Sequence, residues 1–144
     1  MTSAPTAEDH AEVAAIVQNA STSFFGAMRM LPLERRQAIY AVYAFCRVVD
    51  DIADDDDILP EKRKIGLDEW RARISAVYSG KADDASSKVL AFCAPIFALN
   101  QADFIAVIDG MQMDTDTENI TRALLKRGIK CINIVQYDDV ARRN

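Results

Sequence analysis

Apolar residues recur at intervals of three and four positions along most of the chain, which is the spacing of one face of an α-helix. In residues 33–55 this stripe is carried by Ile39, Val42, Cys46 and Val49. No alternation typical of a β-strand continues for more than a few residues. The pattern predicts six helices, over residues 7–20, 24–30, 33–55, 61–78, 85–95 and 101–114. We therefore expect an all-α fold.

Residues that start or stop helices separate these segments. Pro32 suits the first turn of the helix that follows it, Gly80 suits a helix end, and Pro95 is expected to kink or end its helix. Residues 129–135 are rich in β-branched side chains, so that segment leaves helix and strand both open. No Gly- or Ser-rich linker divides the 144-residue chain, which has the length of one domain.

The charge balance narrows the function classes. The chain is 50% hydrophobic and 27% charged, with a net charge of −5, so it is a poor candidate for binding nucleic acid. An anionic substrate would need local arginines or a bridging metal ion. The three cysteines are far apart, which favours free thiols in a reducing cytoplasm over a zinc site. We expect neither a signal peptide nor a membrane-spanning segment.

One face of the helix expected over residues 33–55 carries candidate chemistry. Tyr43, Arg47, Asp50 and Asp54 follow one another at steps of four, three and four residues. Two carboxylates one turn apart suit Mg²⁺, which takes one or two carboxylates together with water and phosphate oxygens. A guanidinium adds donors for phosphate. This face could therefore hold a diphosphate and stabilise the charge that develops as it leaves.

Each of these residues also has a simpler interpretation. The acidic run 50–57 is typical of a solvated loop, especially at its last three positions, and the spacing of Asp50 and Asp54 is common in helices. Arg47 could form an ordinary salt bridge along the helix. Ser21 and Ser23 could cap a helix as well as bind phosphate.

Residues 21–55 resemble the squalene/phytoene synthase family. The likeness joins four elements at matching separations: STSF at 21–24, LPLERR at 31–36, YAFCR at 43–47 and DDIAD at 50–54. DGMQMD at 109–114 is similar to a later family helix. The likeness extends over roughly residues 10–118 and is strongest to the bacterial branch that forms presqualene diphosphate.

This resemblance implies an isoprenoid synthase-type helical bundle that uses Mg²⁺ to condense two farnesyl diphosphates head to head into presqualene diphosphate, on the route to squalene and hopanoids. By position it implies Asp50 and Asp54 as catalytic metal ligands. It implies further substrate-binding residues at Ser21, Ser23, Phe24, Tyr43 and Arg47. Asp114 is a weaker candidate near the metal. Thr22 stands where the family often has a basic residue.

The resemblance does not cover the whole chain. We expect residues 1–120 to be the N-terminal part of a head-to-head prenyltransferase domain and residues 121–144 to be a divergent tail. Because the family's second aspartate motif is not recognisable, we expect weak or no activity from this chain alone. Two alternatives are a phytoene synthase-like enzyme and a non-catalytic helical module that associates with a full-length synthase. Cytoplasmic location is expected, with peripheral membrane contact left open.

Overall fold

The computed structural model describes residues 3–20, 24–55 and 57–126. That part of the chain contains six helices and no strand, so the predicted all-α fold is confirmed. The helices are α1 (Ala7–Asn19), α2 (Phe24–Arg29), α3 (Leu33–Asp54), α4 (Pro60–Ser79), α5 (Ala85–Ile96) and α6 (Gln101–Lys126). No helix in these ranges is both long and apolar enough to cross a bilayer.

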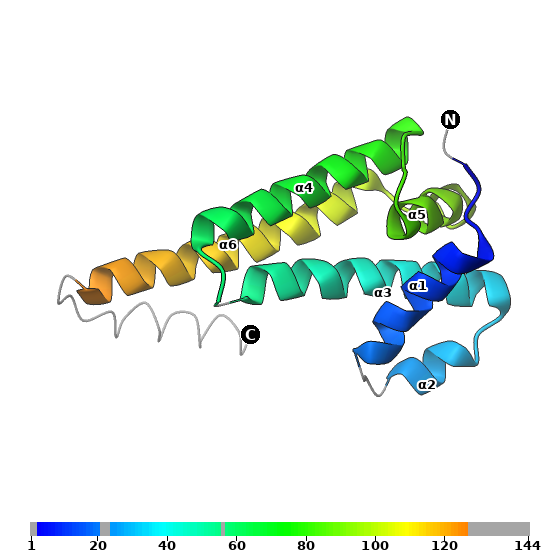
Figure 1. The fold of residues 1–144 in the computed structure, drawn as a ribbon, viewed down its shortest axis with the longest axis horizontal. Coiled ribbons are helices and arrows are strands. Elements are labelled where there is room, and N and C mark those ends of the chain that lie inside the picture. Colours follow the sequence, from blue (N-terminus) through cyan, green and yellow to red (C-terminus); the bar gives the residue numbers. More distant parts are fainter. Residues whose placement is uncertain (1–2, 21–23, 56, 127–144) are drawn as a thin grey trace.

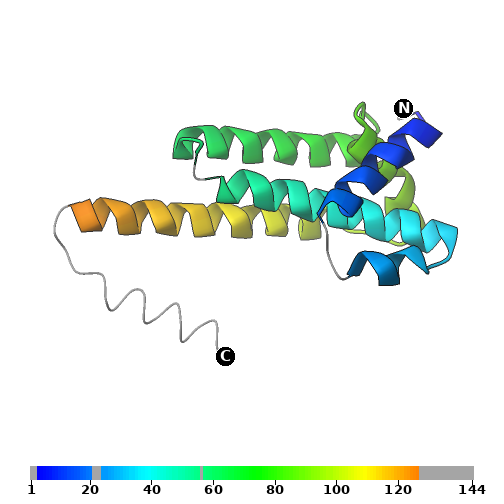
Figure 2. The same ribbon diagram turned by 60° about the horizontal axis from the view of Figure 1, so that its bottom comes forward.

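Helix α3 is the centre of the arrangement and contacts each of the other five helices. Helices α4 and α6 lie along one side of it and pack against each other, whereas α1 and α5 cover its N-terminal half (Figure 1). Helix α6 extends past the C-terminal end of α3 (Figure 2). Any side chain on α3 is therefore positioned by several neighbours at once.

An aromatic cluster fills the space between α3, α4 and α6. The ring of Phe45 on α3 meets Trp70 of α4 edge-on, with centroids 5.7 Å apart, and Phe104 of α6 at 5.1 Å. All three rings are buried. Edge-to-face aromatic pairs at these distances add to the stabilisation that burial already gives. This cluster fixes the depth of α3 in the bundle.

The helix ends follow local sequence signals. Thr6 and Asp9 form a capping box at the start of α1, and the Asp84 side chain accepts a hydrogen bond from the backbone N–H of Ser87 at the start of α5. Pro60 opens α4, and Gly80 ends it in the left-handed region at φ 75°. These residues explain why the expected and observed boundaries agree closely for the first five helices.

The last helix is longer than its pattern indicated. The expected end was at residue 114, but α6 continues to Lys126. No proline or glycine occurs between Gly110 and that residue, and most residues of the segment tolerate a helix, so nothing local stops it. The segment 129–135 and most of the expected tail 121–144 lie outside the described residues.

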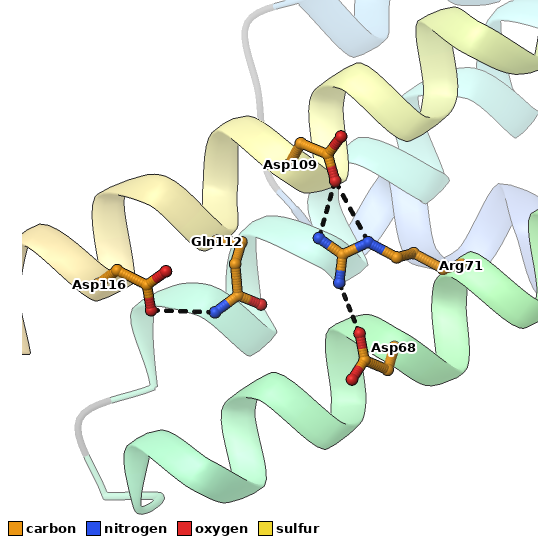
Figure 3. Close-up of polar contacts among 5 residues, drawn as sticks. All are labelled: Asp68, Arg71, Asp109, Gln112 and Asp116. Atoms are coloured by element: carbon orange, nitrogen blue, oxygen red, sulfur yellow. Dashed lines mark hydrogen bonds and ion pairs between the residues drawn. The ribbon is translucent and has the colours of Figure 1, made fainter.

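An arginine on α4 links that helix to α6 on the outside of the bundle (Figure 3). The Asp109 carboxylate accepts from Nε of Arg71 at 3.3 Å and from Nη2 at 2.8 Å, while Nη1 donates to Asp68 at 2.6 Å. One turn further along α6, Gln112 donates to Asp116 at 3.2 Å. Since both carboxylates paired with Arg71 are more than half exposed, the contribution to stability is modest, at most about 1 kcal/mol.

Helices α3 and α4 approach closely near the C-terminal end of α3. A Cβ atom placed on Gly66 would lie 3.0 Å from Cγ2 of Ile52. That distance is shorter than an ordinary van der Waals contact. The glycine therefore allows α4 to pack directly on the turn of α3 that carries the acidic residues.

We expect Gly66→Ala to be less favourable than helix propensity alone predicts. Alanine exceeds glycine by about 1 kcal/mol in a helix interior, but here the added methyl overlaps Ile52. In an Ile52→Ala background the overlap is removed, so the same substitution should be more favourable by about 1 kcal/mol. Urea unfolding of the four proteins in this cycle measures the coupling. Equal effects in both backgrounds would contradict the close approach.

Candidate functional site

The four residues predicted to share a helix face lie on α3, which is continuous from Leu33 to Asp54. Tyr43 and Asp50 are half-buried, whereas Arg47 and Asp54 are exposed. Half-buried and exposed residues therefore alternate along this row to the end of the helix. No break separates the guanidinium from the two carboxylates, so the helical spacing on which the candidate site depends is present.

Asp50 and Asp54 are close enough to perturb each other. Burial raises the pKa of Asp50 above its ordinary value, and the charge of Asp54 and a hydrogen bond between the two carboxyl groups raise it further. Arg47 acts in the opposite direction but does not cancel the increase. The pair is therefore a concentration of negative charge that a cation would relieve.

Arg47 forms the ordinary helix salt bridge that the sequence left open, and its partner is Asp51. Its Nε lies 3.4 Å from Oδ1 of Asp51, one turn further along α3. The two side chains are 43% and 60% exposed, so this ion pair is weak and easily exchanged for a bound anion. The guanidinium thus remains available beside Asp50 and Asp54.

Two neighbouring grooves lie along the part of α3 that precedes the acidic turn. One, of about 260 Å³, is lined by Val42 and Cys46 of α3 and by Phe104 and Val107 of α6, among others. The second, of about 330 Å³, shares Val42 and Leu99 with the first and is almost entirely apolar. Val42, Cys46 and Asp50 follow at steps of four, so the groove-lining residues of α3 and Asp50 lie on neighbouring turns of the same helix side, although neither carboxylate lines a groove.

The other predicted site residues are less well defined. Ser21 and Ser23 lie outside the described residues. Phe24 is the first residue of α2, and its side chain is not among those described. The neighbouring Phe25 stacks on Tyr40 of α3, with centroids 6.0 Å apart, so α2 is held beside α3. Asp114 is exposed on α6.

One buried charge near the candidate site was not predicted. Arg63 on α4 is only 1% exposed, and its Nη1 donates a hydrogen bond to the backbone oxygen of Ala53 at 3.2 Å. A signal for it existed, because Arg63 precedes Leu67 by four and Trp70 by seven residues and so lies on the buried stripe of α4. A charged residue in such a stripe indicates a specific partner.

The donor set fits a magnesium ion shared with a substrate. Within the ranges that the structure describes, no group of three or more histidine, cysteine or acidic side chains is placed to hold a metal. Asp50 and Asp54 instead supply two carboxylates, and Mg²⁺ commonly takes only one or two from the protein while retaining waters and phosphate oxygens. These two residues would hold such an ion.

The structure thus combines an all-helical bundle, an acidic pair on its central helix and an apolar groove along the same helix. Residues 17–127 match the family model described as squalene/phytoene synthase. The chain belongs to this family.

Curated relatives agree with that assignment. The presqualene diphosphate synthase of Zymomonas mobilis is 51% identical over 94 residues, covering 65% of this chain and 32% of that protein. The enzyme of the same name from Rhodopseudomonas palustris is 43% identical over 103 residues, covering 67% and 34%. Phytoene synthase 2 of Solanum lycopersicum is 33% identical over 98 residues, covering 66% and 30%. The chain thus spans about a third of the length of these relatives. No significant match to a solved structure was found.

We expect Asp50→Asn to stabilise the chain at pH 7. Like charges one turn apart cost about 0.2–0.5 kcal/mol, and asparagine removes this repulsion. Folding raises the pKa of Asp50 above 3.8, so the folded state favours the protonated carboxyl group. The stabilisation that protonation gives is fully present below that pH and is lost as the pH rises through the pKa of the folded state. The advantage of asparagine should therefore shrink as the pH falls.

Thermal unfolding from neutral pH down to about pH 3 measures this trend. Asp51→Asn is the matched control, because it removes a charge from the same helix but also the ion pair with Arg47, and it should not stabilise. An Asp50→Asn advantage that persisted undiminished at the acidic end would contradict the crowding of the two carboxylates.

Proposed function

We propose that this chain forms the first diphosphate-binding part of a synthase that joins two farnesyl diphosphates head to head to give presqualene diphosphate. The supporting observation is that one helix, α3, carries the crowded pair Asp50 and Asp54 and also lines an apolar groove, in a chain of the squalene/phytoene synthase family. A diphosphate head and a prenyl tail require that combination. Residues 1–120 would be the N-terminal part of a head-to-head prenyltransferase domain, and residues 121–144 a divergent tail.

The relatives favour presqualene diphosphate over the longer product of the main alternative. Relatives named presqualene diphosphate synthase are 43–51% identical to this chain, whereas those named phytoene synthase are 33–35% identical. The difference supports a farnesyl substrate. A phytoene synthase-like activity would use the same acidic pair with a longer groove.

Different residues of the chain would bind the diphosphate head and the hydrocarbon tail of the proposed substrate. Asp50 and Asp54 would hold Mg²⁺, which supplies positive charge to the departing diphosphate. Arg47 would exchange its weak pairing with Asp51 for phosphate oxygens, and Tyr43 would donate to the same group. The apolar grooves would hold the hydrocarbon and exclude water when the carbon–oxygen bond of the first substrate breaks.

Three residues of the segment 21–24 complete the proposed site. Ser21 and Ser23 would donate hydroxyl hydrogen bonds to diphosphate, and Phe24 would line the hydrocarbon pocket. Because the enzyme would act on and release lipids, we also propose a cytoplasmic location with peripheral contact to the membrane. Farnesyl diphosphate is the expected small-molecule partner, and nucleic acid is not expected.

We expect the 144-residue chain to bind inorganic pyrophosphate in a Mg²⁺-dependent manner, measured by isothermal titration calorimetry. Asp50→Asn and Asp54→Asn should each weaken this binding at least about tenfold, equivalent to roughly 1.4 kcal/mol. Asp57→Asn is the matched control, because it removes the same charge from the same acidic run at an exposed position beyond α3. Binding unaffected by the first two variants would contradict the proposed site.

We expect little or no presqualene diphosphate from the chain alone, since it spans about a third of its relatives. Adding the remaining part of the Zymomonas mobilis relative as a separate polypeptide should restore synthesis from farnesyl diphosphate and Mg²⁺, and Asp50→Asn should abolish it. Product analysis separates presqualene diphosphate from phytoene-type products.

An alternative is a non-catalytic module that pairs with a full-length synthase. This alternative predicts that the chain co-purifies with such a synthase. It also predicts that adding the remaining part of the Zymomonas mobilis relative to the chain restores no activity. Substantial turnover by the chain alone would contradict the expectation that activity also requires the region of the relatives that this chain does not span.

A further inference from the structure

We propose that Arg63 is a positioning residue that fixes the last turn of α3 and thereby holds Asp54 in register with Asp50. The inference rests on the proposed role of this pair in binding a metal ion and a diphosphate. Arg63 is among the largest fully buried side chains, and it comes from a different helix than the pair it would position.

The contact lies at the point where α3 is weakest. The last four carbonyl groups of a helix have no partner within it, and the terminal turn unravels most readily. Ala53 immediately precedes Asp54, which is the final residue of α3. The hydrogen bond from Nη1 of Arg63 to the Ala53 oxygen, at 3.2 Å, gives one of these carbonyls a buried, charged donor. A cation at this end also complements the helix dipole.

A second contact holds the same two helices together one turn away. Gly66 lies directly against Ile52, where a Cβ would be only 3.0 Å from Cγ2. Arg63 and Gly66 are separated by three residues and therefore lie on one face of α4. One polar and one steric contact thus press α4 onto residues 52–53, between the two aspartates of the pair.

The consequence concerns the geometry of the acidic pair. Asp50 lies inside α3 and is held by the regular helix, whereas Asp54 has no helical residue after it, because Asp55 is extended with ψ 95°. If the last turn opened, the Asp54 carboxylate would move away from Asp50 and the two could not share an ion. Arg63 would prevent this through the backbone, without touching metal or substrate. Residues that orient ligands in this way commonly change metal affinity by 10–100-fold when they are replaced.

Two readouts on the 144-residue chain test the inference. The first is Mn²⁺ binding in the presence of inorganic pyrophosphate, followed by electron paramagnetic resonance. The second is amide hydrogen exchange of residues 51–54, which requires no metal. Arg63→Met should weaken Mn²⁺ binding about tenfold and accelerate exchange in these four residues, with little change in α1 or α5.

Arg63→Lys keeps a positive charge that can reach the Ala53 oxygen, so it should restore most of the affinity and the protection. Arg73→Met is the control, because that arginine lies on the same helix, over the Trp70 ring at 4.8 Å, and is exposed. It should leave both readouts unchanged.

A folded Arg63→Met variant with the affinity and exchange of the parent would overturn the inference. If that variant does not fold by circular dichroism, Arg63→Lys is compared with Arg63→Gln in the same two assays, and equal values for lysine, glutamine and the parent overturn it. Failure of the proposed function has a different signature, since the parent would then bind Mn²⁺ no better than Asp54→Asn. In that case the exchange of residues 51–54 still decides whether Arg63 holds the turn.

Discussion

The structure depends on the burial of α3 among five other helices. The side chains of Ala41, Ala44 and Val49 are completely inaccessible to solvent. Phe45, on the same helix, is also buried and contacts aromatic rings of α4 and α6. Small side chains on one part of α3 let neighbouring helices approach, and the large ring fixes their separation. Since the candidate residues extend from the same helix, their positions are determined by this packing and not by a flexible loop.

The sequence predicted the helices well because their signals are local. The apolar spacing of residues 33–55, Pro60 before α4 and Gly80 after it each act within a few residues. The predicted end of α6 was wrong because no local signal marks it. A helix without a stop signal ends where tertiary packing or a later residue ends it.

The candidate site was only partly predictable. The shared face of Tyr43, Arg47, Asp50 and Asp54 follows from helical spacing, and the continuous α3 preserves it. Which carboxylate pairs with Arg47 could not be foreseen, because Asp50 and Asp51, three and four residues further along the helix, are both within reach. Ile39 and Cys46, expected on the apolar side with Val49, are partly open to the grooves. Only the positions of α6 and residues 97–99 distinguish groove from core.

Two of the four candidate residues on α3, Arg47 and Asp54, are exposed in this chain, which spans about a third of the length of its relatives. A cluster of carboxylates that raises the pKa of Asp50 costs stability, and proteins usually tolerate such crowding where a ligand relieves it. Asp54 and Arg47 are exposed, and the groove along the preceding part of α3 is largely apolar. An anion held at the rim, with its hydrocarbon along α3, would satisfy both surfaces. The proposed ligand would account for both the groove and the acidic turn, whereas salt bridging alone accounts for neither the open apolar floor nor the crowded Asp50.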